Sequence, residues 1–394
     1  MSSDLRLIGS DGTATTVPLA AAPAFTKPTS PLTSRVAYAA AHVVPRTTAE
    51  NVQGAPADID WDATLAFRHH VWSWGLGVAD AMDTAQRNMG LDWAACTELI
   101  RRSAAEASTV GGALVVGVNT DHVTDAVISL DAVIAAYLEQ LEVAEDAGAG
   151  VVLMASRHLA RAATSAADYE RVYAEVLSRA STPVVLHWLG EAFDANLAGY
   201  FTSTELSASG SYVAAASDTV IRIMEDNVAK VRGIKMSLLD AASEIAVRRR
   251  LPEGTTLFTG DDFNYVGLIE GDEGGHSDAL LGAFAAIAPS ASAAIQALDR
   301  DDVDEYRRIL GPTEALSRQV FAAPTQYYKT GVAFLAWLNG HQPAFQMVGG
   351  LHSARSIPHL SEIVRLANEA GALERPELAA DRWYGLLALN GLDR

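Results

Sequence analysis

Short apolar runs alternate along the chain with longer segments of helical periodicity. The runs contain few polar residues, which is typical of parallel strands that are covered on both faces. We therefore expect eight strands, at Arg35–Val44, Gly77–Met82, Ala113–Val118, Gly150–Met154, Pro183–His187, Val231–Met236, Thr256–Thr259 and Ser277–Phe284.

Between most of these runs, apolar residues recur every three or four positions, which predicts amphipathic helices. The clearest segments are Trp61–Trp74, Asp92–Ala107, Leu130–Ala147, Ala167–Arg179, Asp218–Val228 and Ala241–Arg249. Strands that alternate with helices favour a parallel α/β fold. Eight of them within roughly 250 residues fit a (β/α)8 TIM barrel better than an open doubly wound sheet. No Gly-rich phosphate-binding fingerprint opens the first repeat, which also disfavours a dinucleotide-binding fold.

Both ends of the chain depart from this alternation. At the start, Leu5–Ile8 and Thr13–Leu19 flank an Asp11-Gly12 turn, which predicts a β-hairpin followed by a Pro-rich linker. After about Asp299 only helical spacing remains, at Val303–Ile309, Pro312–Phe321, Tyr327–Leu338 and Ser356–Glu369. We expect three parts: an N-terminal extension (1–33), a barrel (34–298) and a C-terminal helical region (299–394).

Charge and cysteine content narrow the class of function. The net charge is −19 over 394 residues, which argues against binding to nucleic-acid phosphates or to an anionic membrane surface. The single Cys96 excludes an intramolecular disulfide and a multi-cysteine metal site, and fits a reducing compartment. No apolar run has transmembrane length and no signal-peptide pattern opens the chain, so a cytoplasmic protein is expected.

In a TIM barrel the active site lies at the carboxyl ends of the strands. Polar side chains that follow the predicted strands are therefore candidates to bind substrate, although any one of them could instead cap a helix or shape a loop. They are His42, Asp83, Thr84, Asn119, Ser156, Ser237, Asp262 and His276.

Two further residues are candidates for catalysis. Lys235 lies within the apolar run Val231–Met236, in a chain with only four lysines. Burial disfavours the ammonium form of a lysine, and a neutral amine can form a Schiff base with a carbonyl compound. His187 ends the preceding run, and an imidazole is the usual proton shuttle near neutral pH. A lysine at the end of a strand could also extend its amine into solvent.

The same residues resemble a known family. Arg232-Gly233-Ile234-Lys235-Met236-Ser237 is similar to the Schiff-base lysine motif of the dihydrodipicolinate synthase and N-acetylneuraminate lyase superfamily. Thr259-Gly260-Asp261-Asp262 resembles its Gly-Asp-Asp segment, and Ala147-Gly148-Ala149-Gly150-Val151 resembles the segment that leads into its fourth strand. The resemblance covers about residues 34–370. It implies a class I aldolase fold, imine formation on Lys235, and C-terminal helices.

Two departures from that family bear on the substrate. The family binds the carboxylate of a 2-oxo acid with a Gly-Thr-Thr-Gly-Glu loop, whereas the matching stretch here is Met82-Asp83-Thr84-Ala85-Gln86-Arg87. A carboxylate at Asp83 would repel a substrate carboxylate unless Arg87 compensates. His187 stands where the family has an active-site tyrosine. The chain therefore looks like a divergent, uncharacterised branch.

Three hypotheses for function follow. The first is a Schiff-base lyase, aldolase or hydro-lyase that acts on a small, polyhydroxylated carbonyl compound such as a keto-sugar or sugar acid. It would use Lys235 and His187, without a cofactor. The second is a sugar isomerase, epimerase or hydrolase that depends on a divalent metal held by Asp83, His187, Asp262 and His276. The third is a non-catalytic carbonyl- or sugar-binding protein. In each case we expect a small-molecule ligand and a homo-oligomer, a dimer or a tetramer.

Overall fold

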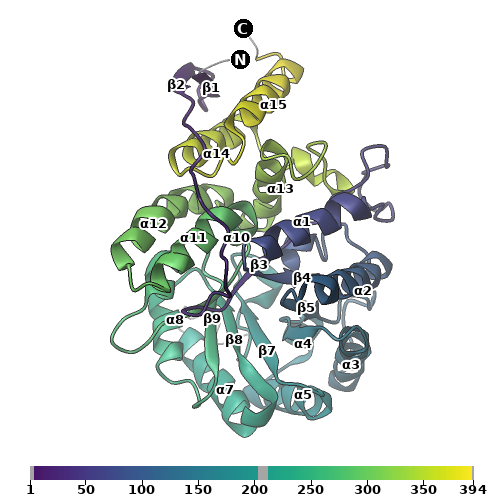
Figure 1. The fold of residues 1–394 in the computed structure, drawn as a ribbon. Coiled ribbons are helices and arrows are strands. Elements are labelled where there is room, and N and C mark those ends of the chain that lie inside the picture. The colour runs from purple at the N-terminus through teal and green to yellow at the C-terminus, as the bar shows by residue number, and fades with distance from the viewer. Residues whose placement is uncertain (1–3, 203–211, 393–394) are drawn as a thin grey trace. The chain divides into compact units, whose positions relative to one another are not determined.

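The structure of the protein is a computed structural model that describes residues 4–202 and 212–392 (Figure 1). Residues 1–3 of the predicted N-terminal extension and 393–394 of the predicted C-terminal region lie outside the described residues. The described strands are β1 (Asp4–Ile8), β2 (Ala14–Pro18), β3 (Ala37–Ala40), β4 (Gly77–Asp80), β5 (Leu114–Val118), β6 (Gly150–Leu153), β7 (Val184–Leu189), β8 (Val231–Ser237), β9 (Thr256–Thr259) and β10 (Asp278–Leu281).

Helices separate most of these strands. Those of the barrel repeats are α1 (Trp61–Ser73), α2 (Trp93–Val110), α3 (Leu130–Asp146), α4 (Arg157–Ala162), α5 (Ala166–Arg179), α7 (Tyr212–Asp226), α8 (Ala241–Arg248) and α9 (Tyr265–Glu270). After β10 come α10 (Ala283–Ala286), α11 (Ala288–Leu298), α12 (Val303–Val320), α13 (Tyr328–Leu338), α14 (Ile357–Glu369) and α15 (Pro376–Leu389).

Eight strands form a closed barrel in the order β10-β3-β4-β5-β6-β7-β8-β9. The predicted TIM barrel, with an N-terminal hairpin and C-terminal helices, is therefore confirmed. Every barrel strand lies within or next to a predicted apolar run, and β9 has the predicted bounds. The first run is the exception in length, since β3 covers only the middle of Arg35–Val44. After β3 ends, the backbone N–H of Val44 donates to Thr64 Oγ1 of α1, at 3.0 Å, and not to a neighbouring strand.

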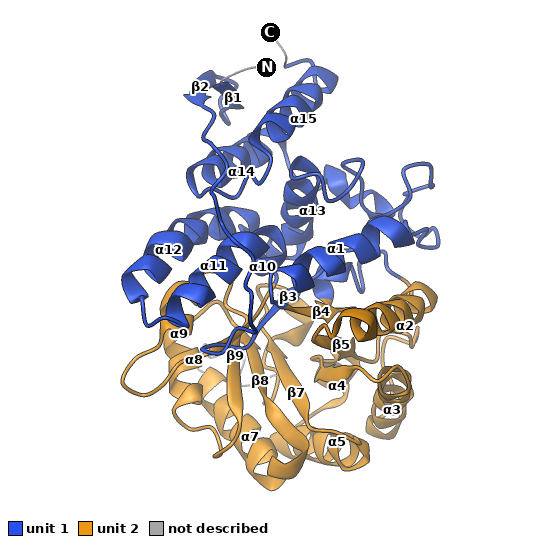
Figure 2. Ribbon diagram, viewed as in Figure 1, with its two compact units in different colours: residues 1–76, 83–91, 282–394 blue, residues 77–82, 92–281 orange. Residues whose placement is uncertain are grey.

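The chain divides into two compact units (Figure 2). Unit 1 comprises residues 1–76, 83–91 and 282–394, and unit 2 comprises 77–82 and 92–281. Strand β3 belongs to unit 1 and strands β4 to β10 belong to unit 2. The division of the chain into an extension, a barrel and a C-terminal region at residues 33 and 298 stays a prediction.

In unit 1, the hairpin β1–β2 packs on the last two helices. Leu5 is fully buried, and the backbone of β1 is held by side chains from far along the sequence. The N–H of Ile8 donates to Ser361 Oγ of α14 at 2.7 Å. The Trp383 indole of α15 donates to the carbonyl of Arg6 at 2.7 Å. The hairpin is therefore part of the folded unit 1 and pairs its polar backbone through the C-terminal helices.

Helix α12 corrects one prediction. Pro312 was expected to separate two helices, but α12 continues through it from Val303 to Val320. A proline inside a helix removes one backbone hydrogen bond and disfavours the helical conformation of the residue before it. Here a continuous buried face, which includes Tyr306, Leu310 and Leu316, packs against α11 and α14 and outweighs that cost.

The C-terminal region also holds the strongly apolar helix α13. Ten of the eleven residues of α13 are buried, including Phe334 and Leu335. Among the described helices, none has both the length and the apolar character needed to cross a bilayer. Helices α11 and α15 were not predicted, because α11 is rich in Ala and Ser and α15 begins beyond the last periodic segment that was recognised.

Unit 2 contains a buried carboxyl group behind β9. Glu244 of α8 is 2% exposed and accepts hydrogen bonds from the hydroxyls of Thr259 at 3.0 Å and Ser277 at 2.8 Å. Burial raises the pKa of Glu244 to about 8, although these two hydrogen bonds lower it. The folded chain therefore holds the proton of Glu244 more tightly than the unfolded chain does.

This pKa predicts that the contribution of Glu244 to stability falls with rising pH. Between the ordinary value of 4.5 and about 8, the folded state binds more protons than the unfolded state, so the free energy of unfolding declines as pH rises. We expect a contribution of up to about 5 kcal/mol from this group. Urea unfolding of the wild-type chain and of Glu244→Gln, between about pH 5 and about pH 8, measures it. Equal slopes of stability against pH in the two proteins would contradict the prediction.

Candidate active site

Lys235 lies two residues before the carboxyl end of β8. Side chains alternate between the two faces of a strand, so Gly233, Lys235 and Ser237 share one face. Lys235 is only 8% exposed, and Ser237 only 2%. Lysine is almost never this buried without a specific role or partner. The strand therefore holds the amine of Lys235 inside unit 2.

His187 lies beside Lys235 on the neighbouring strand. The parallel register of β7 and β8 pairs His187 with Lys235, and Leu189 with Ser237. Residues paired in this way project from the same face of the sheet. His187 is fully buried, and its Nε2 lies 3.3 Å from Ser237 Oγ. An amine, an imidazole and a hydroxyl therefore come together from two adjacent strands.

The protonation state of His187 follows from its surroundings. Burial lowers the pKa of His187 well below the ordinary 6.5, and the positive charge of Lys235 lowers it further. A neutral imidazole carries one N–H and one nitrogen that can accept a proton. Its Nδ1 is buried and has no hydrogen-bond partner among the described residues. His187 therefore has one ring nitrogen beside the Ser237 hydroxyl and one without a hydrogen-bond partner among the described residues.

A glycine at the end of the next strand makes room for the lysine. The N–H of Gly260 donates to the carbonyl of Met236 at 2.7 Å, which holds the two backbones together. A Cβ atom at position 260 would lie 2.6 Å from Lys235 Cε and closer still to Ser237 Oγ. Real Cβ atoms do not approach other atoms so closely. Glycine is therefore required here for Lys235 to keep its position.

The two aspartates that follow this glycine differ in role. The Asp261 carboxylate accepts the backbone N–H groups of Phe263 at 2.9 Å and Asn264 at 3.1 Å, and also the side-chain amide of Asn264. Asp261 therefore shapes the turn after β9. Asp262, the predicted substrate ligand, is 4% exposed and directly follows it.

Asn119 and Ser156 follow β5 and β6 and take part in local structure. The Asn119 side chain accepts the N–H of Thr120 at 2.7 Å, and Ser156 Oγ caps α4 by accepting the N–H of Leu159 at 3.0 Å. The hydroxyl of Thr120 joins them, lying 2.7 Å from both Ser156 Oγ and His158 Nδ1. Sequence reasoning missed His158, whose only signal is its place just after the polar residues that end β6.

Buried tyrosines behind these strand ends were also not anticipated. The Tyr137 hydroxyl donates to the carbonyl of Met154 at 2.6 Å, and the Tyr200 hydroxyl accepts the N–H of Ser156 at 3.1 Å. Burial raises the pKa of Tyr137 and of Tyr200, so both hydroxyls keep their protons. They hold the backbone that follows β6 in place.

His276 is not where it was expected. Strand β10 begins at Asp278, so His276 lies before the strand, at its amino end, and is exposed. The prediction that His276 lies at a carboxyl strand end is therefore wrong. His276 precedes the apolar run Ser277–Phe284, so a strand within that run places it at the amino end.

The remaining predicted residues belong to unit 1, and His42 is the first. It follows β3 and is 2% exposed, with Nε2 3.1 Å from Gln342 Oε1. Burial, together with the charges of Arg68 and His341, lowers the pKa of His42 to about 3. The imidazole of His42 is therefore neutral.

Asp83 and Thr84 form the short 3-10 helix after β4 (Asp83–Ala85). Asp83 is half-buried. Thr84 is 2% exposed, and its hydroxyl lies 2.8 Å from the hydroxyl of Tyr328. The Tyr328 ring stacks on Phe321, with 4.3 Å between ring centroids. A threonine–tyrosine hydroxyl pair therefore follows β4, where the sequence predicted only a threonine.

The metal ligands predicted for the second hypothesis do not form a group. Within residues 4–202 and 212–392, the cluster of His, Cys, Asp and Glu close enough to hold a metal ion consists of His70, His341 and Glu374. It includes none of Asp83, His187, Asp262 and His276. No spacing or motif in the sequence indicates this cluster, since its members lie far apart along the chain.

Solved structures with the same fold are dihydrodipicolinate synthases. That of Thermotoga maritima has a TM-score of 0.65 at 12% identity, over 86% of this chain and all of the other. The 4-hydroxy-tetrahydrodipicolinate synthase of Methylacidiphilum fumariolicum SolV has a TM-score of 0.65 at 16% identity, over 88% and 99%. That of Aquifex aeolicus has a TM-score of 0.61 at 11% identity, over 91% and 99%. The predicted resemblance is thereby confirmed at the level of the fold.

Sequence comparison places the chain more narrowly. No curated protein matches it. A family model described as "Protein of unknown function (DUF993)" matches residues 5–392. The chain therefore belongs to the DUF993 family and has the barrel fold of the dihydrodipicolinate synthases.

Proposed function

We propose that this protein is a Schiff-base lyase or aldolase that acts on a small carbonyl compound. The observation that carries the proposal is the buried Lys235 on β8, paired in register with His187. The space left by Gly260 accommodates its side chain. An amine in such a place is suited to nucleophilic catalysis, and the neighbouring imidazole is suited to moving protons.

The proposed reaction begins when Lys235 Nζ attacks the carbonyl carbon of the substrate. The carbinolamine that forms loses water and becomes an iminium ion. Its carbon–nitrogen double bond accepts the electron pair released when the bond between the α and β carbons breaks. The hydroxyl on the β carbon loses its proton at the same time and becomes the carbonyl group of the departing fragment. Protonation of the enamine and hydrolysis of the imine release the product and restore Lys235. The imine itself is the electron sink, so this scheme requires no cofactor.

His187 is proposed to accept and return the proton in this sequence. Its lowered pKa keeps the imidazole neutral, and therefore able to accept a proton, across the neutral range. The Ser237 hydroxyl holds Nε2, which leaves Nδ1 without another partner. In this proposal Ser237 positions His187 and His187 performs the proton transfer.

For the substrate we propose a polyhydroxylated compound, such as a keto-sugar or sugar-acid derivative. Buried Asn119, Ser156 and Asp262 follow three strands of unit 2 and offer polar groups that can pair with hydroxyls. His42, Asp83 and Thr84 of unit 1 stay proposed substrate-binding residues. A carboxylate at Asp83 disfavours a substrate carboxylate beside it. We further propose that the active protein is a homo-oligomer, as is common for enzymes with this fold.

The first prediction from this proposed function concerns covalent trapping. Treatment with a carbonyl substrate and borohydride should reduce the imine to a stable secondary amine and add the mass of the substrate to one lysine. With only four lysines in the chain, peptide mass spectrometry assigns the site directly. We expect the adduct on Lys235, its loss in Lys235→Ala, and its retention in Lys329→Ala, which removes another buried lysine. An adduct of equal yield in Lys235→Ala would refute the proposal.

The second prediction separates imine formation from proton transfer. Glutamine at position 187 places an amide near Nε2 of the present imidazole but cannot act as a base. We expect His187→Gln to keep the borohydride adduct on Lys235 while lowering kcat by about 10²–10⁴-fold. In the wild-type chain, activity should not decline around pH 6.5, because the pKa of His187 lies well below that value. Unchanged turnover in a folded His187→Gln variant would remove His187 from the mechanism.

The third prediction uses the glycine after β9. Alanine at position 260 brings a Cβ against Lys235 Cε and Ser237 Oγ. We expect Gly260→Ala to lower the yield of the Lys235 adduct at least about tenfold, because the displaced amine no longer meets the substrate. The control is Gly267→Ala in α9, where no atom lies near the added Cβ. Equal trapping in both variants would show that Lys235 tolerates the displacement.

A further inference from the structure

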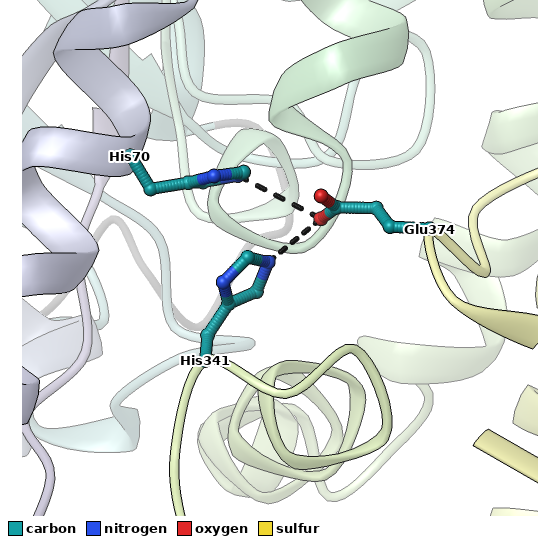
Figure 3. Close-up of side chains that lie close together, drawn as sticks. All are labelled: His70, His341 and Glu374. Atoms are coloured by element: carbon teal, nitrogen blue, oxygen red, sulfur yellow. Dashed lines mark hydrogen bonds and ion pairs between the residues drawn. The ribbon is translucent and has the colours of Figure 1, made fainter. Parts of the chain in front are cut away.

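A second polar cluster lies in unit 1, close to His42, since the Phe67 ring contacts both His42 and His341. His70 comes from the last turn of α1, His341 follows α13, and Glu374 precedes α15. Figure 3 shows both imidazoles pointing toward the Glu374 carboxylate. The Nε2 atoms of His341 and His70 lie 2.7 Å and 3.6 Å from the same oxygen, Oε1. Three segments that are remote in sequence therefore bring two imidazole nitrogens close to one carboxylate oxygen.

The separations fit the coordination shell of a metal. In a tetrahedral zinc site with bonds of about 2.0 Å, neighbouring ligand atoms lie roughly 3.3 Å apart. The two distances to Glu374 bracket that value, and the three ligand atoms all lie within 4.8 Å of one another. Small rotations of the side chains would close the shell. Two imidazoles and one carboxylate are also the ligand set of many catalytic zinc and non-haem iron sites.

The surrounding residues hold the ligands in place. The Asn339 side chain accepts the N–H of Glu374 at 2.9 Å and donates to the carbonyl of Ala372, also at 2.9 Å. Asn339 is 2% exposed and ends α13, two residues before His341. The Phe67 ring stacks on His70, with 5.9 Å between centroids, and meets His341 edge-on at 5.5 Å. A buried amide and a buried ring therefore fix all three ligands, as the supporting residues of metal sites commonly do.

Charge and space also suit a cation with one open position. Imidazole nitrogens are common ligands of transition metals, and the Glu374 carboxylate adds a negatively charged oxygen beside them. Glu374 borders a cavity of about 140 Å³ that is also lined by Phe25, Trp74 and Ser290. Lys27 lies near enough to influence Glu374, but it is exposed, so its opposing charge is screened by solvent. The cavity offers room for a water or a small anion as a fourth ligand.

We propose that His70, His341 and Glu374 bind one divalent transition-metal ion, Zn²⁺ foremost, with an open position toward the cavity. The ion would join α1, the segment after α13 and the segment before α15. The simpler alternative is a hydrogen-bonded cluster in which His341 donates to Glu374 and His70 only packs beside them. The two differ in stoichiometric metal binding, which is what the experiment measures.

The experiment uses the full chain, purified without chelator and with any histidine tag removed. Elemental analysis should find about one zinc per chain after equilibration with Zn²⁺ and dialysis. Co²⁺ in its place should give the intense visible bands of a four-coordinate site. X-ray absorption at the metal edge should show two imidazoles and oxygen ligands, and this measurement needs no variant. Absence of bound metal, or a shell without two imidazoles, would overturn the proposal.

Variants locate the site. We expect Glu374→Gln and His341→Gln to weaken Zn²⁺ binding at least about 100-fold, since changes even to supporting residues cost about 10–100-fold. The controls are His69→Gln, next to His70 on α1, and His122→Gln, which removes a histidine paired with a single carboxylate at 3.2 Å. Both controls should bind Zn²⁺ like the wild type. Equal binding in all four variants would place the metal elsewhere and leave this cluster a hydrogen-bonded pair. Trapping on Lys235 tests the proposed lyase separately.

Discussion

The parallel register of β7 and β8 is the constraint on which the candidate active site depends. Because the side-chain period of a strand is two, a slip of one residue would turn His187 and Lys235 to opposite faces. The observed register puts both on one face and brings Ser237 within reach of the imidazole. Burial then keeps the imidazole neutral. The position of His187 on the strand therefore sets the neutral state of the proposed base, and its Nδ1 has no hydrogen-bond partner among the described residues.

The position of Lys235 also depends on the space that the neighbouring strand leaves for its side chain. A lysine side chain can lie inside a barrel only where neighbouring strands leave volume for its four methylenes and its amine. Gly260 leaves that volume, while its backbone bond to Met236 keeps the strand ends closely apposed. The Gly-Asp-Asp segment therefore has a steric reason for its glycine and a turn-forming reason for Asp261. Only Asp262 in this segment is left with a proposed part in binding substrate.

The sequence predicted the barrel well because strands that are covered on both faces must be apolar throughout, which made every barrel strand visible as a run. Its two catalytic candidates came from the same runs, because Lys235 lies within one of them and His187 ends another, and their chemistry stays a prediction. The prediction of two helices around Pro312 was wrong, because burial of a long apolar face keeps α12 continuous through the proline. The prediction for His276 was also wrong, since this residue lies at the amino end of β10. The cluster of His70, His341 and Glu374 could not be foreseen, since only folding brings these residues together.

The docking of β1 on α14 and α15 has a consequence for how the chain is made. Besides its pairing with β2, the backbone of β1 forms hydrogen bonds with Ser361, Trp383 and Tyr384, which lie more than 350 residues later in the chain. During synthesis, β1 therefore cannot pack against α14 and α15 until nearly the whole chain has been made. Loss of α15 would remove the hydrogen bonds of Trp383 and Tyr384 to β1, so a truncation near the C-terminus would destabilise the N-terminal hairpin.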